Sequence, residues 1–354
     1  MPQPGQRLDH GARLDGFRIA YSLAGAAGAP VVAVLGGISA NRHVAGRAGD
    51  ASSEPTSASP TYNAGWWPAV AGVGRPLDLR SYRVLSIDYL GGPGETARTG
   101  ASRTKGAAPN GAADTASSAA GGSADVPLIT PADQARALAA VISTLGLGPI
   151  RGLIGASYGG AVGLAFAALY AEQVRRVLVI GAAHRSHPLA TAVRVVQRRI
   201  VRRAVAAGDE RGGLSLARAL AMTTYRSDLE FEARFAGPPA LDQPVPRFAV
   251  EDYLDHHGQR FASRFTAAQF LCLSQSLDLH FVDPASVRAA VTLVSIDPDT
   301  LAPRWQVEEL ARRIRGRSRL VRLDSPHGHD AFLTDHDAFG SIIADFLSEA
   351  ELDS

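Results

Sequence analysis

Leu153-Ile154-Gly155-Ala156-Ser157-Tyr158-Gly159-Gly160 is the stretch of sequence that decides the fold, because it sets a Gly-x-Ser-x-Gly pattern between two recognisable elements. Apolar residues lead into it from Ile150, and a run of mostly small residues, 161–170, leads out. The pattern predicts a strand, a sharp turn and a helix, with Ser157 in a strained backbone conformation. The two glycines suit this turn because side chains there would clash with the neighbouring helix or strand. A Gly-x-Ser-x-Gly pattern alone is common by chance, but the flanking strand and helix patterns favour a catalytic serine over a structural turn.

The composition is that of a globular protein rich in small residues. At 354 residues the chain exceeds the size at which a single core usually stops growing, so we expect a main domain with a substantial insertion. The formal net charge of +2 argues against a dedicated nucleic-acid binder. The single cysteine, Cys272, excludes an intramolecular disulfide and is compatible with a reducing compartment. Its apolar neighbours predict a buried side chain.

The sequence shows no sign of targeting to a membrane. Met1 to His10 has neither the basic nor the apolar region of a signal peptide. No apolar run approaches the roughly 18 residues that a membrane span requires. We therefore expect a cytoplasmic protein that contacts neither membrane nor nucleic acid.

Apolar β-branched runs alternate with helical patterns along most of the chain. A helix is expected over 131–145, with Thr130 as its N-cap, and another over 304–315. The predicted strands are 31–35, 82–87, the stretch before Ser157, 176–180, 291–296 and 320–323. This alternation is typical of an α/β fold with a mostly parallel sheet and helices on both faces.

The middle of the chain breaks this alternation. Residues 184–287 hold no clear buried strand, which predicts a helical cap inserted above the carboxyl ends of the strands, where α/β ligand sites lie. The core then has two parts, 1–183 and 288–354. The stretches at about 45–61 and 98–125 are low in complexity and are expected to be surface loops or disorder.

A serine nucleophile needs a base and a carboxylate that orients the base. In folds with this turn the order along the chain is serine, carboxylate, histidine. Asp299 follows one of the late strands and is the preferred carboxylate, with Asp297 as the alternative. His329 follows the last strand, and this position favours a base over a metal site formed with His327 and Asp330.

The developing oxyanion needs two backbone N–H donors. Tyr158 supplies the first from the turn itself, and Gly37, in the loop after the first buried strand, is the preferred second. An ordinary glycine turn is the alternative at Gly37.

The remaining histidine and arginine clusters favour no separate site. The histidines sit in polar loops without the carboxylate spacing of a metal site, so no metal is expected; they are His184, His187, His256 and His257. The arginines at 194, 198, 199, 202 and 203 are most simply a solvated helix face. They are also able to attract an anionic cofactor such as the phosphates of coenzyme A.

With these residues in place, the chain resembles the homoserine O-acyltransferases of the MetX type, within the α/β-hydrolase superfamily. The likeness covers most of the chain outside the two low-complexity stretches. The residues that carry it, in the family's order, are 35–40 (Leu-Gly-Gly-Ile-Ser-Ala), 65–67 (Gly-Trp-Trp), 90–92 (Leu-Gly-Gly), 217–227, 250–254 and 328–333 (Gly-His-Asp-Ala-Phe-Leu).

The resemblance implies transfer of an acyl group from acyl-CoA to the hydroxyl of L-homoserine through an acyl-serine, in methionine biosynthesis. It implies a homodimer and no cofactor beyond acyl-CoA as co-substrate. It also implies that Arg218 and Tyr225, two helical turns apart on one face, meet the homoserine carboxylate, and that Asp330 holds the ammonium. The alternatives are a structural salt bridge for Arg218 and a helix cap for Asp330.

Three departures from the family lie around the expected acyl pocket. Tyr158 stands where methionine commonly follows the serine, residues 35–40 lack the frequent His-Ala-Leu-Thr-Gly, and Pro93-Gly94-Glu95 replaces a cysteine-containing turn. The acyl donor is therefore open: we favour succinyl-CoA, with acetyl-CoA as the alternative. Serine in place of homoserine and a plain esterase or thioesterase are further alternatives. The complete serine, aspartate and histidine set argues against a non-catalytic binding protein.

Overall fold

The structure is a computed structural model that describes residues 2–3, 6–11, 13–14, 17–45, 65–98, 128–241 and 245–348. All structural statements below concern these residues. The two predicted low-complexity stretches lie outside them, apart from their end residues Ala45 and Arg98.

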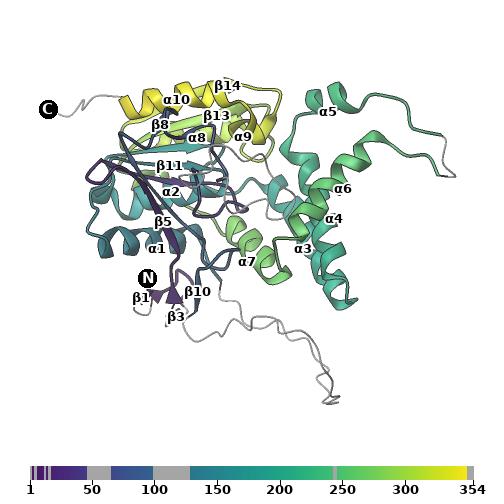
Figure 1. Cartoon of the computed structure of the whole chain (residues 1–354), viewed down its shortest axis with the longest axis horizontal. Helices are drawn as coiled ribbons and strands as arrows, with labels where there is room; N and C mark the ends of the chain where they lie inside the picture. Colours follow the sequence, from purple (N-terminus) through teal and green to yellow (C-terminus); the bar gives the residue numbers. More distant parts are fainter. Residues whose placement is uncertain are drawn as a thin grey trace, which may run out of the picture.

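A seven-stranded sheet forms the centre of the molecule (Figure 1). Its order is β14-β13-β12-β11-β6-β9-β5, and all neighbours are parallel except β5, which runs antiparallel to β9. The strands are β5 (Tyr21–Gly25), β6 (Val31–Leu35), β9 (Arg83–Ile87), β11 (Gly152–Ala156), β12 (Arg176–Ile180), β13 (Ala290–Asp297) and β14 (Ser318–Asp324). The predicted parallel sheet is confirmed.

In the part of the chain that the structure describes, seven short strands pair at the periphery. They are β1 (Pro2–Gln3), β4 (Phe17–Arg18) and β10 (Ala97–Arg98) in one sheet, β2 (Gln6–Arg7) with β3 (Arg13–Leu14), and β7 (Ala71–Gly72) with β8 (Leu77–Asp78).

Apolar side chains cover both faces of the sheet, because alternate residues of a strand point to opposite sides. Val31, Ala33 and Leu35 of β6 belong to one hydrophobic cluster, together with α1 (Pro131–Thr144), α2 (Tyr158–Leu169) and α8 (Arg304–Arg313). Val32 and Val34 belong to a second cluster with α10 (His336–Ser348). Helices on both faces of the sheet confirm the predicted α/β class.

Helix α1 begins where its sequence predicts. The hydroxyl of Thr130 accepts from the N–H of Asp133, and the carboxylate of Asp133 accepts from the N–H of Thr130. This reciprocal pair satisfies two backbone donors that the helix itself cannot satisfy.

Among the described residues, five helices lie between β12 and β13 and form the cap, at one side of the sheet (Figure 1). Cys272 on the last of them is buried, as its neighbours predicted. His256 and His257 lie in a helix and not in a polar loop; that expectation was wrong because the histidines extend an amphipathic stretch. The five are α3 (Pro188–Ala206), α4 (Glu210–Tyr225), α5 (Asp228–Phe235), α6 (Ala249–Ala262) and α7 (Ala267–Asp278).

The remaining helical segments are short. They are η1 (Ala171–Gln173), η2 (Pro284–Ser286), η3 (Gly328–Asp330) and α9 (Ala331–Thr334). Across the part of the chain that the structure describes, no helix combines the length and apolarity that a membrane crossing needs.

Candidate active site

Ser157 occupies the turn between β11 and α2 in a strained conformation. Its φ of +54° makes it the one non-glycine residue with positive φ among the described residues. A Cβ at Gly155 would lie 2.2 Å from the carbonyl oxygen of Gly159, and a Cβ at Gly159 would lie 2.1 Å from that of Leu35. Only glycine permits this close approach, which lifts the serine hydroxyl out of the sheet.

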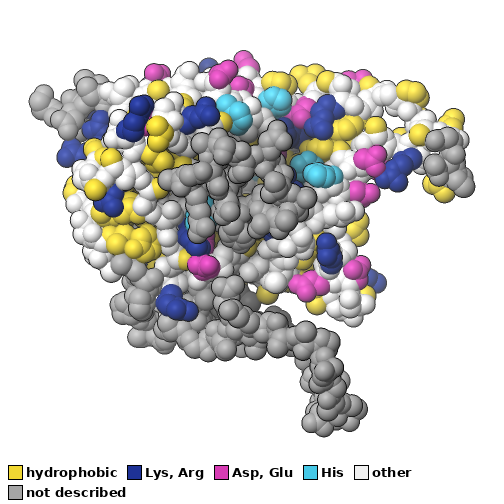
Figure 2. All heavy atoms as spheres, viewed as in Figure 1, with side chains coloured by type: hydrophobic (Ala, Val, Ile, Leu, Met, Phe, Trp, Pro, Cys, Tyr) yellow, Lys and Arg dark blue, Asp and Glu magenta, His cyan; other side chains and the backbone are white. Residues whose placement is uncertain are grey.

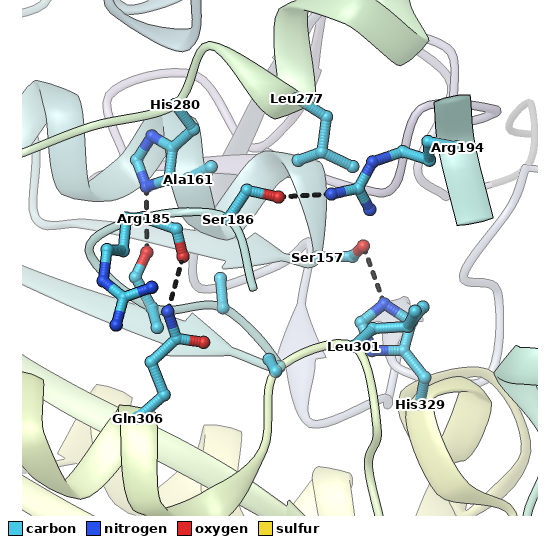
Figure 3. A pocket seen from close by; sticks show the side chains of 14 residues that line it. Ser157, Ala161, Arg185, Ser186, Arg194, Leu277, His280, Leu301, Gln306 and His329 are labelled. Atoms are coloured by element: carbon cyan, nitrogen blue, oxygen red, sulfur yellow. Dashed lines mark hydrogen bonds between the residues drawn. The ribbon is translucent and has the colours of Figure 1, made fainter. Parts of the chain in front are cut away.

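Two hydrogen bonds join Ser157, His329 and Asp299. Nε2 of His329 lies 2.8 Å from Oγ of Ser157, and its Nδ1 lies 2.7 Å from Oδ2 of Asp299 (Figure 3 draws the first of these). The carboxylate also accepts from the backbone N–H groups of Leu301 and Ala302. A proton on Nδ1, facing the carboxylate, leaves Nε2 free to accept the serine proton.

The electrostatic surroundings strengthen His329 as a base. Burial by itself would lower its pKa, but the charge of Asp299 and the hydrogen bond to it outweigh burial. The net effect raises the pKa of His329 above its ordinary value of 6.5.

Asp297 and His327, the alternative candidates near the site, pair with other residues. Asp297 forms a half-exposed ion pair of 2.6 Å with Arg304. His327 turns to the cap, where its Nδ1 lies 3.0 Å from the carboxylate of Glu230. Within the described ranges no three His, Cys, Asp or Glu side chains are grouped closely enough to hold a metal ion.

The two predicted oxyanion donors lie beside Ser157. The position of a Cβ on Gly37 is 4.0 Å from Cβ of Ser157, and Tyr158 follows the serine directly. Neither backbone N–H has an acceptor among the residues that the structure describes. Both donors are therefore available to a ligand oxygen.

A cavity opens next to Ser157 and His329 (Figure 3). Arg194 of α3 reaches across it toward Ser186, and Arg185 lies on another wall near Gln306. The other lining residues are Ala161, Gly181, Ala182, Ala183, Leu277, His280, Leu301 and Ala302.

The predicted solvated face of α3 is wrong for two of its five arginines. Arg194 and Arg198 are largely buried, and both donate to the carboxylate of Asp278 on α7, at 2.7 and 2.6 Å. Arg199, Arg202 and Arg203 are exposed, as predicted. Residue type alone could not separate the two groups, because the packing of α7 decides which stripe of α3 is covered.

Arg218, Tyr225 and Asp330 lie near His329 but do not line this cavity. The guanidinium carbon of Arg218 lies 4.9 Å from the ring centre of Tyr225 and 5.5 Å from that of Phe261. The Tyr225 ring in turn lies 5.9 Å from the His329 ring. No described carboxylate pairs with Arg218, which leaves its charge free to meet an anion.

Asp330 is buried beside Arg226. Its carboxylate lies 3.3 Å from Nε of Arg226, without an aligned hydrogen bond from that atom. Burial raises the pKa of Asp330, and the charge of Arg226 opposes this. The side chain of Asp330 does not cap α9. Its oxygens therefore remain able to accept from a ligand.

Similar proteins share this fold and much of this sequence. The family described as alpha/beta hydrolase fold matches residues 43–336. The homoserine O-succinyltransferase of Xanthomonas campestris pv. campestris is 38% identical, over 94% of this chain and 79% of its own. The homoserine O-acetyltransferase of Moorella thermoacetica is 31% identical, over 98% of this chain and 94% of its own.

Among solved structures, the homoserine O-acetyltransferase of Bacillus anthracis superposes with a TM-score of 0.78 at 17% identity, covering 98% of this chain and 96% of that one. At this identity the superposition establishes the α/β-hydrolase fold alone. The sequence relatives carry the finer conclusion: this chain belongs to the homoserine O-acyltransferase family of α/β-hydrolase enzymes.

Proposed function

We propose that this protein is a homoserine O-succinyltransferase that works through an acyl-serine. His329, oriented by Asp299, takes the proton of Ser157 as the serine oxygen attacks the thioester carbonyl of succinyl-CoA. The N–H groups of Gly37 and Tyr158 hold the oxyanion. The carbon–sulfur bond then breaks, and the proton on His329 passes to the departing coenzyme A thiolate.

The second half-reaction repeats the chemistry with an amino acid. The hydroxyl of L-homoserine gives its proton to His329 as its oxygen attacks the ester of Ser157. The serine oxygen leaves and recovers the proton, so that succinylated homoserine is released as a precursor of methionine. No step needs a metal or a further cofactor. The cap must keep water away from the acyl-serine, since water would compete as an acceptor.

The observation that favours a succinyl donor is the positive charge of the cavity beside Ser157. Arg194 and Arg198 share the single carboxylate of Asp278, and Arg185 has no ion-pair partner among the described residues. Largely buried cations need an opposite charge nearby. The terminal carboxylate of a succinyl group supplies that charge, whereas an acetyl group does not.

Arg194→Gln is expected to lower kcat/KM for succinyl-CoA about 10- to 100-fold, because a charge-assisted hydrogen bond contributes about 1.5–3 kcal/mol. The value for acetyl-CoA should change less than about threefold. Arg199→Gln, an exposed position on the same helix, is the control and should leave both donors unaffected. Equal losses for the two donors would contradict the assignment of Arg194 to the succinyl carboxylate.

The acceptor is expected to bind as a zwitterion between Arg218 and Asp330. The rings of Tyr225 and Phe261 support the guanidinium of Arg218, so little ordering is needed when a carboxylate arrives. The ammonium meets Asp330, whose sequence neighbour His329 faces the hydroxyl. A simple esterase has no use for such a pair of opposite charges.

Arg218→Ala is expected to raise the KM for homoserine about 10- to 100-fold and to leave the formation of the acyl-enzyme from succinyl-CoA unchanged. Steady-state rates over a range of homoserine concentrations and a rapid-quench measurement of acylation separate the two effects. Arg211→Ala, one exposed position on the same helix, is the control. A variant that acylates slowly but binds homoserine normally would remove Arg218 from the acceptor site.

Release of free coenzyme A decides between transferase and hydrolase. We expect fast release from succinyl-CoA with homoserine, and slow release with serine, with no amino acid, or from acetyl-CoA. Release that is independent of the amino acid and that yields free succinate would make the protein a thioesterase. Faster release with serine than with homoserine would make serine the acceptor.

We also propose that the protein acts as a cytoplasmic homodimer. Apolar side chains are exposed on the cap, where α3 presents Leu189, Val196 and Val205 and α4 presents Leu216. On the face shown in Figure 2, apolar side chains lie among basic and acidic ones over the cap. Light scattering on the purified protein measures its mass in solution. We expect the mass of a dimer, and we expect Leu216→Glu to lower this mass because it places a charge in the contact between the caps.

A further inference from the structure

Neither Gly36 nor Gly37 has a side chain that could fix the peptide group between them. Two consecutive glycines allow such a peptide to rotate at little cost. The carbonyl oxygen and the N–H of one peptide group point in opposite directions, because the group is planar and trans. Whatever holds the carbonyl oxygen of Gly36 therefore aims the N–H of Gly37.

Two hydrogen bonds hold that carbonyl oxygen. The backbone N–H of Gly159, in the turn that carries Ser157, donates to it at 2.9 Å. The hydroxyl of Tyr89 donates to it at 2.7 Å. Tyr89 follows β9 and is 2% exposed, so water does not compete for the bond. Burial raises the pKa of Tyr89 well above its ordinary value, which keeps the hydroxyl protonated as a donor.

The ring of Tyr89 also touches the residue that carries the second donor. The rings of Tyr89 and Tyr158 meet edge to face, with their centres 4.8 Å apart. The Tyr158 hydroxyl is fixed on its far side by Ser276 of α7 at 2.7 Å and by Gln134 of α1 at 3.2 Å. Tyr89 thus contacts the peptide of one oxyanion donor and the side chain of the other.

The neighbour of Tyr89 holds the far end of the same loop. Asp88 is buried and accepts from the backbone N–H of Arg42 at 2.8 Å, and it forms an ion pair with the guanidinium of Arg42. Residues 36–42 are consequently anchored at both ends by two consecutive residues.

We infer that Tyr89 is a positioning residue for the oxyanion hole. This inference rests on the proposed acyl-serine mechanism, in which Gly37 and Tyr158 donate to the oxyanion. Tyr89 acts in two ways: it prevents the Gly36–Gly37 peptide from rotating, and its hydrogen bond polarises that peptide so that the N–H of Gly37 donates more strongly. It does not touch the reacting atoms.

Tyr89→Phe tests the inference, because the change keeps the ring and removes the donor. We expect the rate of acylation by succinyl-CoA to fall about 10- to 100-fold, somewhat less than the loss of an oxyanion donor itself. The carbonyl stretch of the acyl-enzyme, formed with ¹³C-labelled succinyl-CoA in the absence of homoserine, should move to higher frequency in the infrared. The succinyl-CoA concentration that half-saturates the acylation rate and the pH at which His329 titrates should stay unchanged.

A purely structural role would not move the carbonyl band. Tyr170→Phe, which removes a half-buried hydroxyl at the end of α2, is the control and should leave the carbonyl band and the acylation rate unchanged. If Tyr89→Phe lowers the thermal stability, 3-fluorotyrosine at position 89 replaces it; its more acidic hydroxyl should move the band to lower frequency.

An unshifted carbonyl band in both Tyr89 variants would overturn the inference while leaving the acyl-serine mechanism intact. Failure of the unmodified protein to form any acyl-enzyme would instead overturn the mechanism, and the inference with it. The two failures are therefore distinguishable in one set of spectra.

Discussion

Ser157→Ala is expected to lower kcat about 10⁵-fold or more with succinyl-CoA and homoserine, and to leave no acyl-enzyme. The serine oxygen is the atom that receives the acyl group, so no other residue replaces it. The loss should equal the loss caused by removing the whole set, because serine, histidine and aspartate act as a unit. Mass spectrometry after mixing with succinyl-CoA alone detects the added succinyl group, which should be present in the unmodified protein and absent in the variant.

Ser143→Ala is the matched control, since Ser143 is an exposed residue of α1 that faces no part of the site. It should acylate at the normal rate. A fully active Ser157→Ala variant would refute the acyl-serine scheme as a whole.

Asp299→Asn is expected to lower kcat about 10³- to 10⁴-fold and to move the pH profile. The amide can donate to Nδ1 of His329, which favours the tautomer with its proton on Nε2, the wrong nitrogen for a base. The pH effect follows because burial lowers the pKa of His329 whereas Asp299 raises it. With Asp299 present the pKa lies above 6.5, and without its charge burial dominates and lowers the pKa below that value.

Activity requires neutral His329, so it rises with pH through this pKa and is lost below it. The half-maximal pH of kcat/KM for succinyl-CoA should thus lie above 6.5 in the unmodified protein and below 6.5 in the variant. Asp297→Asn is the control: it removes only the half-exposed pair with Arg304 and should change neither rate nor profile. Similar losses in the two variants would contradict the choice of Asp299.

The fold was predictable from sequence wherever a strand is buried on both faces, because such a strand consists of a continuous apolar run. The strands from Val31, Arg176 and Ala290 lie within a residue of their predicted starts. The antiparallel edge strand β5 was not foreseen, because Tyr21–Gly25 is only partly buried and its sequence lacks such a run. Its pairing with β9 depends on a neighbour 60 residues away, which local pattern does not reveal.

The positions that sequence reasoning singled out by their place after a strand are the ones that the structure brings together. Asp299 and His329 follow β13 and β14, and parallel strands deliver their carboxyl ends to one edge. Arg194 was wrongly predicted to lie on a solvated helix face, and Tyr89 was not singled out, because the role of each depends on its partner in the folded chain. A buried arginine in a basic run, and a tyrosine hydroxyl aimed at a distant carbonyl, become visible only when tertiary packing is known.

The cap is a single insertion between β12 and β13, and Ser157, Asp299 and His329 all lie outside it. Arg194 and Arg218, the cations assigned to donor and acceptor, stand on α3 and α4 within it. In the proposed mechanism the bond-making residues thus lie in the core, and the two cations that select the substrates lie in the cap, while Asp330 is the contribution of the core to acceptor binding. We therefore expect that substitutions in the cap can change the acyl group or the amino acid that is accepted, while Ser157, Asp299 and His329 stay unchanged.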